Sequence, residues 1–136
     1  MTTDVSTVID RLYNSFETGD AAAWEELLAD DAVVIGTDPN EFWDDMGSAM
    51  TALRAQLNEM KDAGMKLEPG NRLTRNVGSG VTLFVDRPTL KLGDGGTVPL
   101  RLSIVIADVG SALTIKHIHL SVPAANEDVL DTALTT

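Results

Sequence analysis

The chain contains no cysteine among its 136 residues. It therefore forms no disulfide and offers neither a thiolate metal ligand nor a cysteine nucleophile. It also has no apolar run of about 18 residues, so we predict no membrane span. The first residues, MTTDVSTVIDRLYNSF, lack the basic start and apolar block of a signal peptide. Together these absences favour a cytoplasmic protein, of the kind found in bacteria.

Positive charge is also scarce, and the net charge is −11. Residues 1–70 hold 15 acidic and 4 basic residues, whereas residues 71–136 hold 6 of each. An acidic surface repels phosphate backbones, so we predict that the protein binds no nucleic acid. The acidic half is interpreted as a solvated helical surface that keeps the protein soluble.

The length of the chain predicts one domain, and 43% hydrophobic residues supply its core. We find no repeat and no internal linker. The domain is predicted over residues 1–123. The remaining residues, 124–136, form a polar tail that is either disordered or folded into one helical turn.

Two helices are predicted at the start of the chain. An apolar stripe at helical spacing defines the first one, which Thr3 caps and Gly19 ends. Asp20 then caps a second helix over residues 21–29. The residues of the stripe are Val5, Val8, Ile9, Leu12, Tyr13 and Phe16.

The stretch AVVIGTDPNEFWDD is predicted to pass from a strand into a third helix. The segment 32–36 is too short for a helix and contains β-branched residues, which favours a buried strand. Asp38 then resembles an N-cap, Pro39 the first helical residue, and Glu41 the third residue of a capping box. We expect Gly47 and Ser48 to interrupt this helix, and its apolar stripe continues through Met46, Met50, Leu53, Leu57 and Met60.

From Met65 onward the pattern is that of strands. The segments predicted are 66–69, 72–77, 81–86, 89–92, 97–107 and 112–122. Strict alternation in the last strand places His117 and His119 on one face with Ile115. Neither face of the long strands is fully polar, so each face of the sheet should pack against another layer of protein. We expect the helices to cover one face and a second copy of the chain to cover the other.

The order of elements, with GTDPNEFWDD after the first strand and IKHIHLSVP in the last, resembles the nuclear transport factor 2 superfamily. Within it, the chain resembles the SnoaL-like group over about residues 4–123. The resemblance implies an α+β cone in which three N-terminal helices pack on a strongly curved, mainly antiparallel sheet. It also implies a pocket and a homodimer formed through the sheet. The superfamily contains isomerases, cyclases, dehydratases and epoxide hydrolases as well as non-catalytic members, so the fold leaves the function open.

The resemblance assigns some catalytic positions. Steroid isomerases and many cyclases have an aspartate base just after the first strand, where Asp38 stands. Their tyrosine donor falls at Leu12, with Tyr13 one residue away, and their second donor falls near Ser103. Arg101 and Asp38 match two parts of the Asp-Arg-Asp arrangement of the epoxide hydrolases.

Each catalytic candidate has a structural alternative. Asp38 is either a general base or an N-cap carboxylate. His117 and His119 match the paired histidines of the dehydratases and are either acid–base groups or histidines of the core or the dimer interface. They lack a third ligand, so we predict no metal, and we expect no organic cofactor.

The candidate ligand-binding residues are predicted around one pocket between the third helix and the inner face of the sheet, opening near residues 38–43. Phe42, Trp43, Tyr13 and Met50 are assigned to its wall, with ordinary core packing as the alternative. Arg101 either grips an oxygen of the ligand or pairs with an acidic residue. We expect a small apolar or aromatic ligand. The expected activity is proton transfer, as in isomerases, cyclases or dehydratases, and the alternative is a non-catalytic binding or assembly module.

Overall fold

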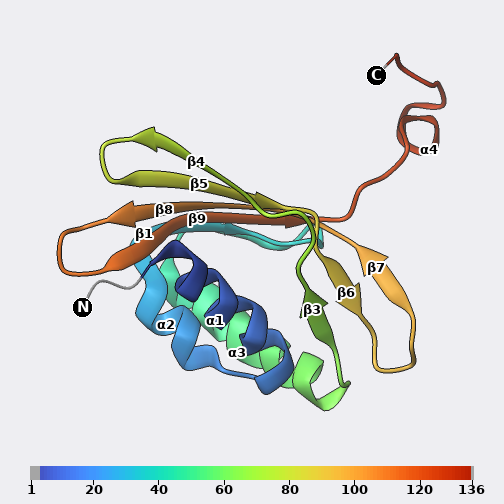
Figure 1. Ribbon diagram of the computed structural model, residues 1–136. Coiled ribbons are helices and arrows are strands. Elements are labelled where there is room, and N and C mark those ends of the chain that lie inside the picture. The colour runs from blue at the N-terminus through green and yellow to red at the C-terminus, as the bar shows by residue number, and fades with distance from the viewer. Residues whose placement is uncertain (1–3, 136) are drawn as a thin grey trace.

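The computed structural model describes residues 4–135, in which three helices lie along one face of a curved sheet (Figure 1). The first two helices are α1, Val5–Thr18, and α2, Ala21–Leu27. Asp4 caps α1 by accepting the N–H of Thr7 at 2.8 Å. The predicted cap Thr3 lies outside the described residues. Gly19 ends α1 at φ 72°, and Asp20 caps α2, as the Gly-Asp sequence predicts.

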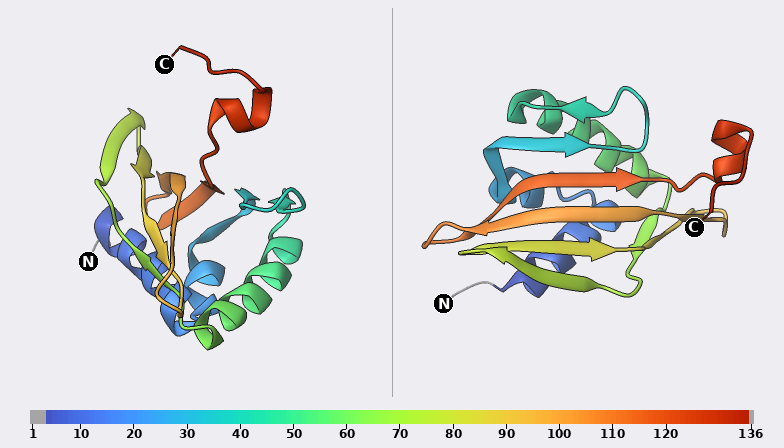
Figure 2. Two further views of the ribbon diagram at one scale, coloured as in Figure 1. Left: turned by 90° about the vertical axis from the view of Figure 1, so that its right-hand side faces the viewer. Right: turned by 90° about the horizontal axis from the view of Figure 1, so that it is seen from above.

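The large sheet has six strands in the order β2-β1-β9-β8-β5-β4. Strands β1 and β9 pair in parallel, and the other neighbouring strands of this order pair antiparallel. A second sheet, β3-β6-β7, turns beside the helices at one end of the molecule (Figures 1 and 2). The bounds of the strands are β1 Leu28–Ile35, β2 Phe42–Trp43, β3 Lys66–Glu68, β4 Leu73–Gly78, β5 Val81–Asp86, β6 Thr89–Lys91, β7 Thr97–Pro99, β8 Arg101–Asp108 and β9 Leu113–Ser121. The predicted α+β architecture is therefore confirmed.

The core lies between the helices and the inner face of the large sheet. The apolar stripe of α1 is buried there because residues three and four apart share one side of a helix. The third helix, α3, Met46–Asp62, contributes Leu53 and Leu57, and alternate residues of the strands meet them from the sheet. The largest apolar side chains under 2% exposed are Ile9, Leu12, Leu57, Phe84, Ile104, Ile106 and Ile115.

The segment between β1 and α3 differs from its prediction. A turn follows β1, and Phe42 and Trp43 then pair with Ile35 and Val34 as the short strand β2. The helix begins only at Met46, where Asp45 accepts the N–H of Ser48 at 2.7 Å. The predicted N-cap role of Asp38 and the predicted interruption at Ser48 are therefore wrong.

The contacts of a capping box nevertheless form, beginning with the side chain of Glu41. It accepts the N–H of Asp38 at 2.8 Å, which is the bond a capping box would form. The carboxylate of Asp38 accepts the N–H of Asn40 at 2.9 Å, as an N-cap side chain also can. These contacts close a turn. The chain then continues as a strand instead of a helix because Phe42 pairs with Ile35 and Trp43 with Val34.

The last strand also departs from strict alternation. Ile106 pairs with Ile115, but Val105 pairs with His117, so Lys116 is an extra residue in β9. This bulge leaves Ile115 on the inner face with Ile118. It turns His117 to the outer face, together with His119, which stands opposite Ser103.

The chain continues beyond the sheet into a short helix, α4, Asn126–Leu130, which stands away from the sheet and the other helices (Figures 1 and 2). No helix within residues 4–135 has the length and apolar character needed to cross a membrane.

Candidate functional site

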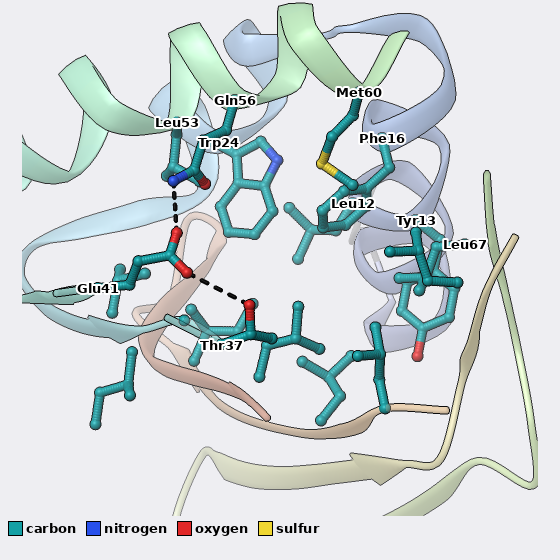
Figure 3. A pocket seen from close by; sticks show the side chains of 18 of the residues that line it. Leu12, Tyr13, Phe16, Trp24, Thr37, Glu41, Leu53, Gln56, Met60 and Leu67 are labelled. Carbon is teal, nitrogen blue, oxygen red and sulfur yellow. Dashed lines mark hydrogen bonds between the residues drawn. The ribbon is translucent and has the colours of Figure 1, made fainter. Parts of the chain in front are cut away.

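A cavity of about 340 Å³ lies between α1, α3 and the inner face of the sheets (Figure 3). This volume is at the lower end of the range for small-molecule sites. Its wall is mainly aliphatic and aromatic. Both tryptophans of the chain, Trp24 and Trp43, take part in the wall.

The helical wall is held in place by its own contacts. Phe16 and Trp24 meet edge to face, with ring centroids 6.0 Å apart. The indole N–H of Trp24 donates to Oγ of Ser15 at 2.8 Å, and that hydroxyl donates to the carbonyl of Leu12 at 2.5 Å. Since its polar atom is already engaged, Trp24 presents an apolar surface to the cavity. On the opposite side, the sheet contributes side chains that include Leu102, Ile104, Ile118 and Leu120.

Thr37, Glu41 and Gln56 form a polar end of the cavity, and Glu59 is a further carboxylate of its lining. Figure 3 shows the carboxylate of Glu41 between Thr37 and Gln56. The amide Nε2 of Gln56 donates to Oε2 of Glu41 at 2.5 Å. The other oxygen, Oε1, accepts from the backbone N–H of Asp38 at 2.8 Å and from the hydroxyl of Thr37 at 3.5 Å. Glu41 is thus a partly buried carboxylate that neighbouring donors orient.

Tyr13 contributes its ring to the wall, but its hydroxyl is engaged elsewhere. The hydroxyl donates to Oδ2 of Asp86 at 2.7 Å, and Asp86 is 1% exposed. Burial, together with the hydrogen bond and the charge of Asp86, raises the pKa of Tyr13 far above its usual value. The backbone N–H groups of Gly70 and Arg87 also donate to this carboxylate. These hydrogen bonds to Asp86 connect α1 to the end of β5, and the phenol of Tyr13 stays neutral.

Among the predicted ligand-binding residues, the structure brings Tyr13 and Trp43 to the cavity. Met50 is buried in the hydrophobic core and does not line the cavity. Phe42 is 63% exposed, because its pairing with Ile35 turns it away from the face that carries Trp43. Arg101, at the start of β8, is also exposed and outside the cavity.

The predicted catalytic residues do not converge on the cavity. Asp38 is exposed in the turn after β1, where its carboxylate holds Asn40. His117 and His119 lie on the outer face of the sheet, with ring centroids 6.3 Å apart. The ring nitrogen Nδ1 of His117 lies 2.8 Å from the carbonyl oxygen of Val33. The assignment of these three residues to catalysis inside the cavity is therefore not supported by their positions. Within residues 4–135, no three His, Asp or Glu side chains are grouped so as to hold a metal ion.

The sequence interpretation missed Glu41 and Gln56 as cavity residues. Glu41 had a complete explanation as part of a capping box, so nothing in the motif pointed inward. A weak signal existed in α3, since Leu53, Gln56 and Met60 follow one another at helical spacing and all line the cavity. A polar residue inside such an apolar stripe indicates either a buried hydrogen bond or a binding site.

A layer of helices on a strongly curved sheet, with a cavity between them, defines the class of NTF2-like proteins with a cystatin-like fold. Solved structures agree on the fold. An uncharacterised protein with a cystatin-like fold from Caulobacter vibrioides is 17% identical, covers 93% of this chain and 92% of its own, and has a TM-score of 0.76. An NTF2-like protein of unknown function from Pseudomonas putida KT2440 is 18% identical over 96% of this chain and 90% of its own, with a TM-score of 0.74.

A third similar structure is a protein from Shewanella frigidimarina that is provisionally assigned as a ketosteroid isomerase. It is 12% identical, covers 84% of this chain and 91% of its own, and has a TM-score of 0.69. The comparison with curated proteins gave no match. The SnoaL-like domain matches residues 5–125, which is most of the chain, so this protein belongs to the SnoaL-like domain family.

Proposed function

We propose that the protein binds a small, mainly apolar or aromatic organic molecule in the cavity. The observation that carries this proposal is an apolar wall with Thr37, Glu41 and Gln56 gathered at one end. Such a site holds the body of a ligand by apolar burial and orients it through a few hydrogen bonds.

Tryptophan fluorescence tests this proposal, because both tryptophans line the cavity. Titration with 4-phenylbutanol is expected to change the emission saturably. Leu120→Phe adds volume inside the cavity and should weaken binding. Leu130→Phe makes the same change on exposed α4 and should leave binding unaltered. The proposal fails if a panel of such ligands gives no saturable change, or if both variants bind as the wild type does.

We further propose that Glu41 serves as the proton acceptor if a reaction takes place in the cavity. Its support is a carboxylate that Gln56 and the N–H of Asp38 hold at the edge of an apolar space. A base positioned in this way suits isomerisation, cyclisation or dehydration. Glu41→Gln keeps the shape of the side chain and should abolish turnover of any substrate found. Retained turnover in this variant would remove Glu41 from the chemistry.

A non-catalytic binding module is the second candidate, and the gathering of the polar side chains at one end favours it. Acid–base chemistry on a ligand usually requires groups that converge on the reacting atoms from more than one side. Under this alternative, Glu41 only accepts a hydrogen bond from the ligand. Glu41→Gln would then change affinity without any turnover having been present in the wild type.

We also propose a homodimer formed through the outer face of the large sheet. Half-buried Val33, Leu83, Val85 and Val105 lie on this face, and within residues 4–135 no helix covers it (Figure 1). An apolar sheet face of this kind is stabilised by a cover. Sedimentation equilibrium should give twice the chain mass of 14.5 kDa, and Val105→Glu should give the monomer. A wild-type protein that stays monomeric at micromolar concentration would contradict the proposal.

A further inference from the structure

We propose that the ligand of this cavity is an organic cation, namely an aromatic or alicyclic body that carries a protonated amine. This inference rests on the proposed binding function and adds the chemical class of the ligand. It places the ammonium group at the polar end beside Glu41 and the apolar body against the wall of the cavity.

The charge of the cavity lining is the first argument. The lining contains two carboxylates, Glu41 and Glu59, and among the described residues it contains no lysine, arginine or histidine. An anionic ligand would place its charge beside these carboxylates with no cation to compensate it, which is costly in a partly desolvated space. The net charge of −11 works in the same direction, since it attracts cations toward the protein and repels anions.

The hydrogen-bonding character of the polar end is the second argument. Gln56 gives an amide N–H to Glu41, which leaves the amide oxygen of Gln56 as an acceptor. Thr37 gives its hydroxyl hydrogen to the same carboxylate, so the lone pairs of this hydroxyl are left to accept. A carboxylate has about four acceptor positions, and the three donors around Glu41 leave at least one for a ligand.

An ammonium group matches this set of acceptors. It carries three N–H donors and no acceptor, so it can bond to Glu41 and to neighbouring oxygens at once. Charge-assisted bonds of this kind are stronger than neutral ones. Trp24 and Trp43 belong to the same wall, and aromatic rings attract cations rather than anions to their faces, which are negative.

The test compares three ligands that share one body, 4-phenylbutylamine, 4-phenylbutanol and 4-phenylbutyrate. Their dissociation constants are measured by tryptophan fluorescence at neutral pH. The amine is expected to bind at least about tenfold more tightly than the alcohol, and the carboxylate more weakly than the alcohol. The preference for the amine should decrease when the ionic strength is raised from about 0.01 M to about 0.5 M, because salt screens the ion pair.

Variants locate the preference within the protein. Glu41→Gln should bring the affinity for the amine close to that for the alcohol, with the alcohol itself little changed. Glu59 lines the cavity but is exposed to solvent, so Glu59→Gln should have a smaller effect of the same sign. Glu127→Gln, on exposed α4, removes an equal charge far from the cavity and should preserve the preference.

The outcomes separate the two proposals. If none of the three ligands binds, the proposed function itself fails. If the alcohol binds but the amine binds no more tightly than the alcohol or the carboxylate, the cavity is a binding site and the inference about its ligand is wrong. An amine preference that persists in both Glu41→Gln and Glu59→Gln would also overturn the inference about the ligand. The salt dependence of the amine preference is measured on the wild type, so this test does not depend on how the variants fold.

Discussion

The contact between Tyr13 and Asp86 predicts how the stability of the protein responds to alkaline pH. The folded protein holds the pKa of the Tyr13 phenol far above its usual value of about 10, chiefly because the ring is buried and then because of Asp86. In the unfolded chain the phenol loses its proton near pH 10. The stabilisation by the neutral phenol is therefore complete below pH 10 and decreases as the pH rises above it.

The size of this loss follows from the proton balance. Between pH 9 and pH 11 the unfolded phenol releases most of its proton while the folded phenol keeps it. The free energy of unfolding should decrease by about 1.4 kcal/mol over this interval from Tyr13 alone. Urea unfolding of the wild type and of Tyr13→Phe at both pH values isolates this contribution, because other groups titrate alike in the two proteins.

Tyr13→Phe has a second expected effect at neutral pH. It removes a bond to a buried carboxylate, and we expect a loss of about 1.5–3 kcal/mol in the free energy of unfolding. The N–H groups of Gly70 and Arg87 remain as donors, so Asp86 stays partly satisfied and the variant should still fold.

Absorbance gives an independent reading, since Tyr13 is the single tyrosine of the chain. No phenolate signal is expected at pH 11 while the protein is folded, and the signal should appear together with unfolding. Phenolate formation near pH 10 in a protein that retains its tertiary structure would refute the reasoning. An identical pH dependence of stability in Tyr13→Phe and the wild type would refute it as well. Asp86→Asn removes one of the causes and should bring the titration of Tyr13 to lower pH.

Three further predictions concern stability, and urea unfolding measures each of them. Asp45→Ala should cost about 1 kcal/mol because it removes the N-cap of α3, whereas Asp38→Ala should cost less than about 0.5 kcal/mol; the opposite order would place the start of the helix at Asp38. Gly70→Ala should cost about 2 kcal/mol or more, because the added Cβ would lie 2.3 Å from the carbonyl oxygen of Arg87, and a neutral effect would mean that this loop relaxes freely. Leu57→Ala should cost about 2–5 kcal/mol, because the side chain is 1% exposed, and a cost below about 1 kcal/mol would contradict its place in the core.

The helices at the start of the chain were predictable because their signals are local. The stripe of α1 repeats over several turns, and Gly19 and Asp20 mark the corner by the backbone conformation and the cap that they supply. Each of these signals acts within a few residues. The end of the second helix, predicted at residue 29, lies at Leu27 because Leu28, the first residue of β1, pairs with the distant Ile115. The resemblance to the NTF2-like superfamily added the curved sheet, which composition and periodicity alone do not specify.

The turn after β1 was not predictable from its motif. Asp38, Pro39 and Glu41 satisfy the pattern of a helix start, and the bond from Glu41 to the N–H of Asp38 does form. The pairing of Phe42 with Ile35 decides the outcome, because it extends the sheet and delays the helix to Met46. A contact of this kind competes with a local cap, and the sequence of the segment does not show which one prevails.

The face of the sheet that His117 and His119 occupy was not predictable for another reason. One extra residue at Lys116 reverses the alternation of every residue after it, and a bulge leaves little trace in a sequence of alternating apolar residues. The bulge places His117 and His119 on the outer face, whereas the sequence interpretation left open whether they are acid–base groups or residues of the core or the dimer interface. Glu41, which the sequence interpretation explained as part of a capping box, lines the cavity, and the two histidines do not.

The parallel pairing of β1 with β9 has a consequence for protein synthesis. Val33 pairs with His117, so a strand made early on the ribosome waits for a partner made near the end. Until β9 emerges, β1 and β2 have no connection to β8, because β9 lies between them in the sheet. A nascent chain that stops before Leu113 would expose the apolar surfaces of α1 and α3, and such surfaces are bound by chaperones.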